Sequence, residues 1–200
     1  MNLIHESKMS GKLAGIWAIN TNTLTNKFCS TMRKTDAICN ECYSASMLQG
    51  SRKNCQPAFQ RNSDVLSQAI DYDDLPFINA AFYRFHGHGE LINMAHMKNF
   101  HNIARKNPHC TFGLWTKRRD IIRQYHLEFK QPKNLILIYS NPSVGVVRQP
   151  PHGFDKCFNV VGKDEFVENQ NCTGQKCIDC LKCYRHEGDS IIIEAIKKRN

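Results

Sequence analysis

Residues 135–139 read LILIY, an unbroken apolar run that ends at the polar pair Ser140 and Asn141. An apolar run without the alternation of a half-exposed strand is typical of a strand that is buried on both faces, as in a parallel sheet. The run is far too short to cross a bilayer. This stretch therefore predicts an α/β protein built around a buried parallel sheet.

The segments around this run alternate between strand and helix patterns. We predict strands at residues 15–20, 79–85, 111–116 and 156–161, helices at 44–50, 58–70, 94–106 and 119–128, and a short strand or helix at 190–198. Repeated strand–helix units favour parallel strands, and parallel sheets present their functional groups at the strands' C-terminal ends. Polar residues follow three of these strands, at 86–90, 115–117 and 140–141.

Length and composition predict one main domain. The chain has 200 residues, of which 41% are hydrophobic, enough for a core. We expect residues 1–160 to form a partial α/β barrel, and the Cys-rich segment 161–200 to pack on it as an appendage. The first twelve residues, MNLIHESKMSGK, contain no apolar core of a secretion signal, which favours a cytoplasmic protein, the host cytoplasm if a phage encodes it.

The chain is basic, with 27 Lys and Arg residues against 18 Asp and Glu residues, a formal charge of +9. This excess favours an anionic partner such as nucleic acid or a nucleotide. A solvated basic surface that only aids solubility accounts for it equally well. No dense basic and aromatic motif of an RNA-binding type is present.

Three cysteines lie close together near the N-terminus: Cys29, Cys39 and Cys42. Thiolates this close together are typical of a metal site, and three of them leave one coordination position of an iron or zinc centre open. We favour an iron–sulfur cluster over zinc, because zinc would need a fourth ligand such as Cys55 or a histidine.

Four more cysteines lie within twelve residues near the C-terminus: Cys172, Cys177, Cys180 and Cys183. Four thiolates close a site, which makes it structural or electron-carrying. The spacing suits a [4Fe–4S] cluster, and zinc is the alternative. Ten cysteines in a chain that is not exported argue against a disulfide scaffold, although the isolated ones, Cys55, Cys110 and Cys157, suit buried small hydrophobes.

A glycine-rich loop, HGHGE, spans residues 86–90 directly after a predicted strand. Its glycines, Gly87 and Gly89, would let a ligand approach the backbone closely, and Glu90 could hold an ammonium group. The same pattern is often only a turn. The loop's histidines, His86 and His88, could be metal ligands or a general acid and base.

Other polar residues are expected near the glycine-rich loop, at the C-terminal ends of the neighbouring strands. Ser140 and Asn141 follow a strand, and so does Lys117. Lys117 and the two arginines after it could reach an anionic substrate, although such a run is more often the solvated start of a helix.

The order of these motifs resembles the phage gene product 88 family over roughly residues 10–185. The features that carry the resemblance are a cysteine loop ending CYS at 42–44, QRN at 60–62, YRFHGHGE at 83–90, the strand at 112–117 and a Cys-rich tail ending CY at 183–184. This family looks like a small relative of radical S-adenosylmethionine (SAM) enzymes.

The resemblance implies an incomplete (β/α) barrel of radical SAM type with a Cys-rich, metal-binding C-terminal appendage. Cys29, Cys39 and Cys42 would hold a [4Fe–4S] cluster that chelates SAM, and the C-terminal cysteines would hold an auxiliary cluster or zinc. Glu90 would fix the SAM amino group. The first cysteine gap is nine residues here, against three in most radical SAM enzymes.

The resemblance also assigns roles to the surrounding residues. Gly87, Gly89, Ser140 and Asn141 would bind the cofactor, and His86 and His88 would join Glu90 as catalytic groups. A reductant such as a flavodoxin would supply electrons to a catalytic cluster.

Two non-enzymatic hypotheses stay open at this point. In one, the metals are structural and the basic surface binds nucleic acid or a host protein, as a phage regulator or inhibitor would. In the other, the protein is a cluster-based electron carrier.

Overall fold

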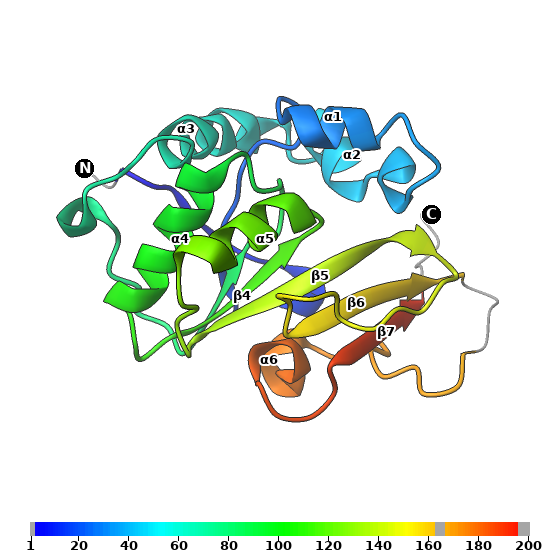
Figure 1. Ribbon diagram of the computed structural model, residues 1–200. Helices are drawn as coiled ribbons and strands as arrows, with labels where there is room; N and C mark the ends of the chain where they lie inside the picture. Colours follow the sequence, from blue (N-terminus) through cyan, green and yellow to red (C-terminus); the bar gives the residue numbers. More distant parts are fainter. Residues whose placement is uncertain (1–2, 163–166, 196–200) are drawn as a thin grey trace.

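The computed structural model describes residues 3–162 and 167–195, and its centre is one mixed, seven-stranded sheet (Figure 1). The strands lie in the order of the chain, β1 antiparallel to β2 and all later neighbours parallel. The strands are β1 (Glu6–Lys8), β2 (Trp17–Ile19), β3 (Phe82–Phe85), β4 (Thr111–Thr116), β5 (Leu135–Val144), β6 (Lys156–Val161) and β7 (Ile191–Ala195). The predicted α/β class is confirmed, and the sheet is open rather than a closed barrel.

Helices and 3₁₀ helices connect the strands. The α-helices are α1 (Lys27–Met32), α2 (Tyr43–Gln49), α3 (Gln56–Leu66), α4 (Met94–Lys106), α5 (Arg119–Glu128) and α6 (Cys177–Cys180). The 3₁₀ helices are η1 (Gly11–Leu13), η2 (Ile38–Glu41), η3 (Lys53–Cys55), η4 (Tyr72–Asp74) and η5 (Lys182–Tyr184). In Figure 1, α1, α2 and α3 lie at the upper end and α6 at the lower end.

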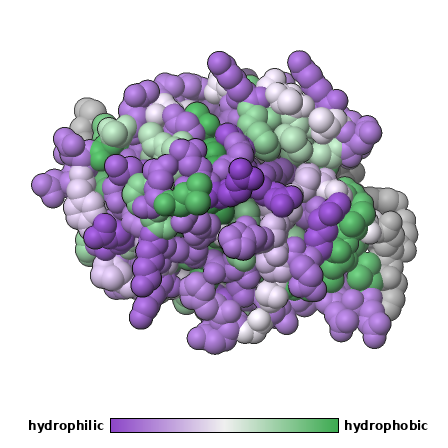
Figure 2. Space-filling model, in the orientation of Figure 1, coloured by the Kyte–Doolittle hydropathy of each residue, from purple (hydrophilic) through white to green (hydrophobic). Residues whose placement is uncertain are grey.

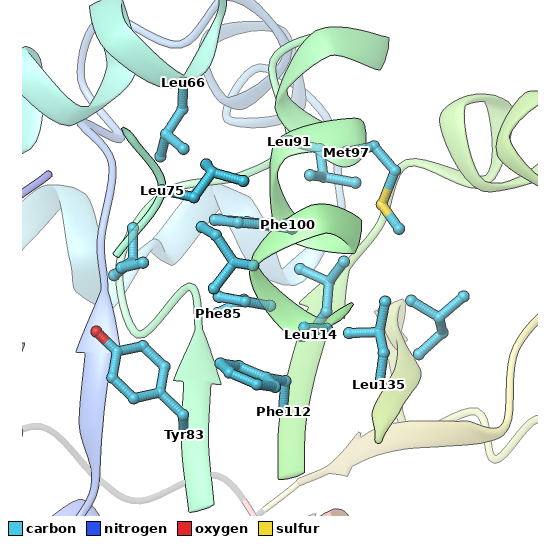
Figure 3. Packing of buried hydrophobic residues seen from close by; sticks show 14 of the residues in the cluster. Leu66, Leu75, Tyr83, Phe85, Leu91, Met97, Phe100, Phe112, Leu114 and Leu135 are labelled. Carbon is cyan, nitrogen blue, oxygen red and sulfur yellow. The ribbon is translucent and has the colours of Figure 1, made fainter. Parts of the chain in front are cut away.

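One face of the sheet packs against α4 and α5 and forms the larger core (Figure 3). Alternate residues of β3, β4 and β5 point to this face, as the two-residue period of a strand requires. Phe85 stacks on Phe100 of α4 with ring centroids 3.9 Å apart, and Phe112 stacks on the other side of Phe85 at 4.8 Å. Burial of such rings is a main source of stability in a domain of this size.

The opposite face of the sheet is covered by the Cys-rich segment. Trp115, Ile136 and Ile138 point to this side and form a second core with Leu181 and Tyr184. Strand β7 then pairs with β6 in the same sheet. The C-terminal segment is thus tied to the fold both by a strand and by a buried apolar contact.

Several elements differ from the sequence prediction. Strand β5 continues to Val144, so Ser140 and Asn141 lie inside it rather than after it, at a register shift against β6. The expected boundary at residue 160 falls within β6. Strand β1 and helix α1 were not predicted, and residues 196–198 of the segment expected at 190–198 lie outside the described residues.

Within residues 3–162 and 167–195, no helix has the length and apolar character needed to span a membrane. Most of the face in Figure 2 is hydrophilic, with small hydrophobic patches between the polar side chains.

Candidate functional site

The N-terminal cysteines lie on two short helices at the edge where the parallel strands end. Cys29 belongs to α1, Cys39 to η2, and Cys42 is the residue that precedes α2. Helix α1 begins where the side chain of Asn26 accepts a hydrogen bond from the Cys29 backbone N–H at 3.1 Å. The same Asn26 side chain donates to the Glu90 carbonyl at 3.0 Å. Asn26 therefore joins the cysteine segment to the glycine-rich loop.

Two of the N-terminal thiols, Cys29 and Cys39, have raised pKa values. Burial is the largest cause, and the charges of Glu90 and Cys42 raise both pKa values further. The ammonium group of Lys117 acts in the opposite direction on both thiols. The structure thus places the Lys117 ammonium group and the Glu90 carboxylate near the N-terminal thiols.

These groups are not arranged as a ready-made metal site. Among the residues that the structure describes, no set of three or more His, Cys, Asp or Glu side chains stands in position to hold a metal ion. The donors still suit a metal chemically, because they are three partly exposed, mutually interacting thiols on one short segment. The four-cysteine segment has the same character.

Glu90 is buried, with 5% of its surface exposed, and is held by its own chain. Oε1 accepts hydrogen bonds from the Thr116 hydroxyl and, at 2.8 Å, from the Leu91 N–H, and Oε2 accepts one at 2.8 Å from the Lys117 N–H. Burial raises the pKa of Glu90, and the Lys117 charge and these hydrogen bonds oppose that rise. A carboxylate can accept about four hydrogen bonds, so Oε2 keeps one acceptor position that no described residue fills.

The two glycines of the loop lie against the protein itself. A side chain on Gly87 would come within 2.4 Å of the Met9 methyl group, and one on Gly89 within 2.0 Å of the Thr21 hydroxyl. Glycine is therefore needed at both positions because other parts of the chain approach closely: Met9, which precedes β2, at Gly87, and Thr21, which follows β2, at Gly89. A ligand at Gly87 would have to displace the flexible Met9 side chain.

His88 is part of a buried hydrogen-bond network. Its Nδ1 lies 2.8 Å from the Ser44 hydroxyl, and its backbone N–H donates to the Asn20 side chain at 2.8 Å. Burial, together with the charges of Arg52 and Arg84, lowers the pKa of His88 to about 4. The ring is therefore neutral at pH 7.

His86 is buried in a more apolar setting. Its ring packs edge-to-face against His96 and Phe100, with centroids 5.1 and 5.2 Å away. Burial lowers the pKa of His86 to about 3, although the nearby Trp115 backbone favours the charged ring slightly. Within the described residues neither ring nitrogen makes a hydrogen bond of ordinary geometry.

Ser140 and Asn141 have separate roles. The Ser140 hydroxyl accepts a hydrogen bond from Lys117 Nζ at 2.9 Å, which places it beside the three-thiol group. Asn141 is 1% exposed, and its amide donates to the Val146 carbonyl and the Asn159 side chain. Asn141 thus stabilises the register shift between β5 and β6.

The C-terminal cysteines also form one interacting group. Burial raises the pKa of Cys183 to about 12, Arg84 lowers it, and the other three thiols, Cys172, Cys177 and Cys180, raise it. Lys12 donates to Cys172 Sγ at 3.6 Å and pairs with Glu194. Arg84 lies over the Trp115 ring at 3.6 Å. Two cations therefore accompany this group, as thiolates would require.

Two residues of the site were not predicted to take part: Asn26 and Lys12. Asn26 had a readable signal, because an Asn three residues before Cys29 suits a helix N-cap. Lys12 had none, since its partner Cys172 is distant in the sequence. Thr116 was expected at this strand end, but its hydrogen bond to Glu90 was not predicted.

Comparison with known proteins places the chain in a family but gives no activity. No curated protein and no solved structure matches it. The family model described as gene product 88 matches residues 5–145, which includes Cys29, Cys39, Cys42 and the glycine-rich loop but not the four C-terminal cysteines. Since this match covers more than half of the chain, the protein belongs to the gene product 88 family, as the order of its motifs indicated.

Proposed function

We propose that this protein is an iron–sulfur protein of radical SAM type, in which Cys29, Cys39 and Cys42 hold a [4Fe–4S] cluster. What supports the proposal most is the group of three interacting thiols at the C-terminal edge of the parallel strands, with Lys117 beside them. The parallel strands β2 to β7 lie in the order of the chain, as the strands of a (β/α) barrel do, although this sheet does not close.

The chain's own residues would prepare the site for such a cluster. Asn26 fixes the Cys29 backbone relative to Glu90. Lys117 places a positive charge near the thiols and so favours their thiolate forms. A [4Fe–4S] cluster held by three thiolates supplies an iron that can bind SAM and an electron for its cleavage, and the remaining acceptor position of Glu90 Oε2 would receive the SAM amino group.

The C-terminal cysteines, Cys172, Cys177, Cys180 and Cys183, would hold a second centre, an auxiliary [4Fe–4S] cluster or zinc. Its place is on the face of the sheet opposite α4 and α5, next to the core of Trp115 and Tyr184. Four protein ligands close such a site, so its role is structural or electron-carrying.

Replacing Cys39 by alanine is expected to remove the N-terminal cluster. Protein purified without air should lose about four iron and four sulfide per chain relative to wild type, as a [4Fe–4S] cluster contains. Cys55→Ala is the matched control, because Cys55 is equally half-exposed but lies outside both groups. Equal iron in the two variants, or a colourless protein that contains only zinc, would contradict the proposal.

A second candidate function is a non-enzymatic protein with structural metals that binds nucleic acid or a host protein. It is favoured because the chain's own atoms occupy the positions at which SAM would bind. Glu90 accepts three hydrogen bonds from the protein, and Met9 and Thr21 cover the loop glycines. The basic charge of +9 suits an anionic partner.

Calorimetric titration with SAM separates the two candidates. On the first, wild type with its iron intact binds SAM, and Glu90→Gln weakens binding about tenfold or more, because one charge-assisted hydrogen bond to the ammonium group is lost. Glutamine keeps the size of the side chain, so that the loop can remain folded. Iron-loaded protein without SAM affinity, together with salt-sensitive binding of nucleic acid, would favour the second candidate.

A further inference from the structure

A hollow of about 670 Å³ lies on another side of α1, between this helix, α3 and the start of α5. Its size is that of a small-molecule site. None of its described lining residues is a cysteine or belongs to the 86–90 loop. Asn26, which caps α1 before Cys29, also lines the hollow, so the hollow adjoins the N-terminal thiol group but does not contain it. On one side it is lined by Lys27 and Phe28 of α1. On the other sides it is lined by Gln60 and Asp64 of α3, by Ser67 after α3, and by Arg118 before α5.

Phe28 and Arg118 form a rigid flat surface in this hollow. The guanidinium group of Arg118 lies 5.1 Å from the centre of the Phe28 ring. It is fixed by Asp120 at 2.9 Å and by the carbonyls of Leu91 and Ile92 at 3.0 and 3.1 Å. Phe28 itself is only partly buried. An aromatic ring backed by a guanidinium group is a suitable surface on which a nucleobase can stack.

The facing wall offers oriented hydrogen-bonding groups. Gln60 is held in one orientation, because its oxygen accepts from the Thr25 hydroxyl at 2.6 Å and its amide donates to Asp64 Oδ1 at 2.7 Å. Asp64 is exposed, and its Oδ2 makes no hydrogen bond within the described residues. An exposed carboxylate of this kind can accept hydrogen bonds from ribose hydroxyls.

Lys27 supplies a positive charge at the rim of the same hollow. Its ammonium group has no ion-pair partner within the described residues, and the side chain is exposed. A flexible ammonium group is a common ligand for phosphate. The hollow therefore combines a stacking surface, a hydroxyl-binding carboxylate and a phosphate-binding cation.

From this combination we infer that the hollow binds a nucleotide unit, with the base on Phe28, the ribose at Asp64 and the phosphate at Lys27. The unit can come from a free nucleoside monophosphate or from a single-stranded nucleic acid, and both present the same chemistry. The inference does not depend on a metal at either cysteine group.

The test is an NMR titration of backbone amides of the full chain with adenosine 5′-monophosphate and, separately, with a short single-stranded oligoribonucleotide. Binding should shift the amides of residues 25–31 and 60–67. Tighter binding of the oligonucleotide, with a steeper salt dependence, identifies a strand as the source, and equal affinities identify the free nucleotide. No shift with either probe, or shifts only outside the hollow, overturns the inference.

Phe28→Leu is the variant that tests the stacking surface, because leucine keeps apolar bulk but removes the aromatic face. Affinity should fall about tenfold or more, the loss of one base-stacking contact. Phe77→Leu is the matched control, since Phe77 is 69% exposed and is not part of the hollow's lining. Equal affinity in the two variants would overturn the inference. Unchanged iron content in Phe28→Leu would separate this result from any failure of the cluster proposal.

Discussion

Gly89→Ala is expected to lower the free energy of unfolding by about 3–5 kcal/mol, the sum of backbone strain and overpacking. Gly89 has a φ of +95°, a conformation that L-residues rarely adopt. Its new methyl group would lie 2.0 Å from the Thr21 hydroxyl and 2.7 Å from the Thr21 carbonyl oxygen. Because one of these contacts is backbone, rotation of the Thr21 side chain alone cannot relieve the clash. Urea denaturation followed by circular dichroism measures the loss.

Gly174→Ala is the matched control for this prediction. Gly174 has a φ of +96°, nearly that of Gly89, but nothing lies within 4 Å of an added methyl group. It should therefore show only the conformational cost, about 1–2 kcal/mol. Equal losses in the two variants would mean that the contact between the loop and Thr21 does not constrain the protein. Thr21→Ala in the Gly89→Ala background should recover part of the loss, since it removes the hydroxyl but leaves the carbonyl.

The sequence predicted the elements whose signals are local. Helices α4 and α5 and strands β4 and β6 begin and end at the residues expected from apolar spacing and flanking polar residues. Strand β5 was predicted to end at Tyr139, because Ser140 and Asn141 look like a loop. The strand continues because Asn141 replaces the lost ladder contacts with hydrogen bonds to Val146 and Asn159. Such compensation depends on β6 and cannot be read from the β5 segment alone.

The candidate site was predictable in its location but not in its internal contacts. Polar residues after parallel strands were expected to meet, and Glu90 and Lys117 do lie together. The sequence did not indicate that the Glu90 carboxylate would be held by Thr116 and by two backbone N–H groups, because these contacts join separate strand ends. The glycines of the 86–90 loop were likewise assigned to a ligand, whereas their neighbours in the structure are Met9 before β2 and Asn20 and Thr21 after it.

Acidification from pH 7 to pH 5 is expected to destabilise the protein steeply, through His86 and His88. In the folded state burial lowers their pKa values to about 3 and about 4, against 6.5 for an exposed histidine. Below pH 6.5 the unfolded chain therefore binds protons at these two histidines that the folded protein does not bind. His96, whose pKa burial also lowers well below 6.5, adds to the effect. Stability is present in full above pH 6.5 and is lost as the pH falls toward the folded values. Each histidine contributes about 1.4 kcal/mol per pH unit in this window.

His88→Gln separates this effect from the titration of carboxylates. Glutamine can still bond to Ser44 but cannot take a proton, so the pH dependence of stability between pH 6 and pH 5 should become shallower by about 1.4 kcal/mol per unit. His152→Gln, at an exposed position, serves as the control and should leave the slope as in wild type. Urea unfolding of wild type and of both variants at pH 7, 6 and 5 gives the slope of stability against pH for each protein. If His88→Gln keeps the wild-type slope, burial does not protect His88 from protonation. The packing of the 86–90 loop against Ser44 and Asn20 then does not persist in solution.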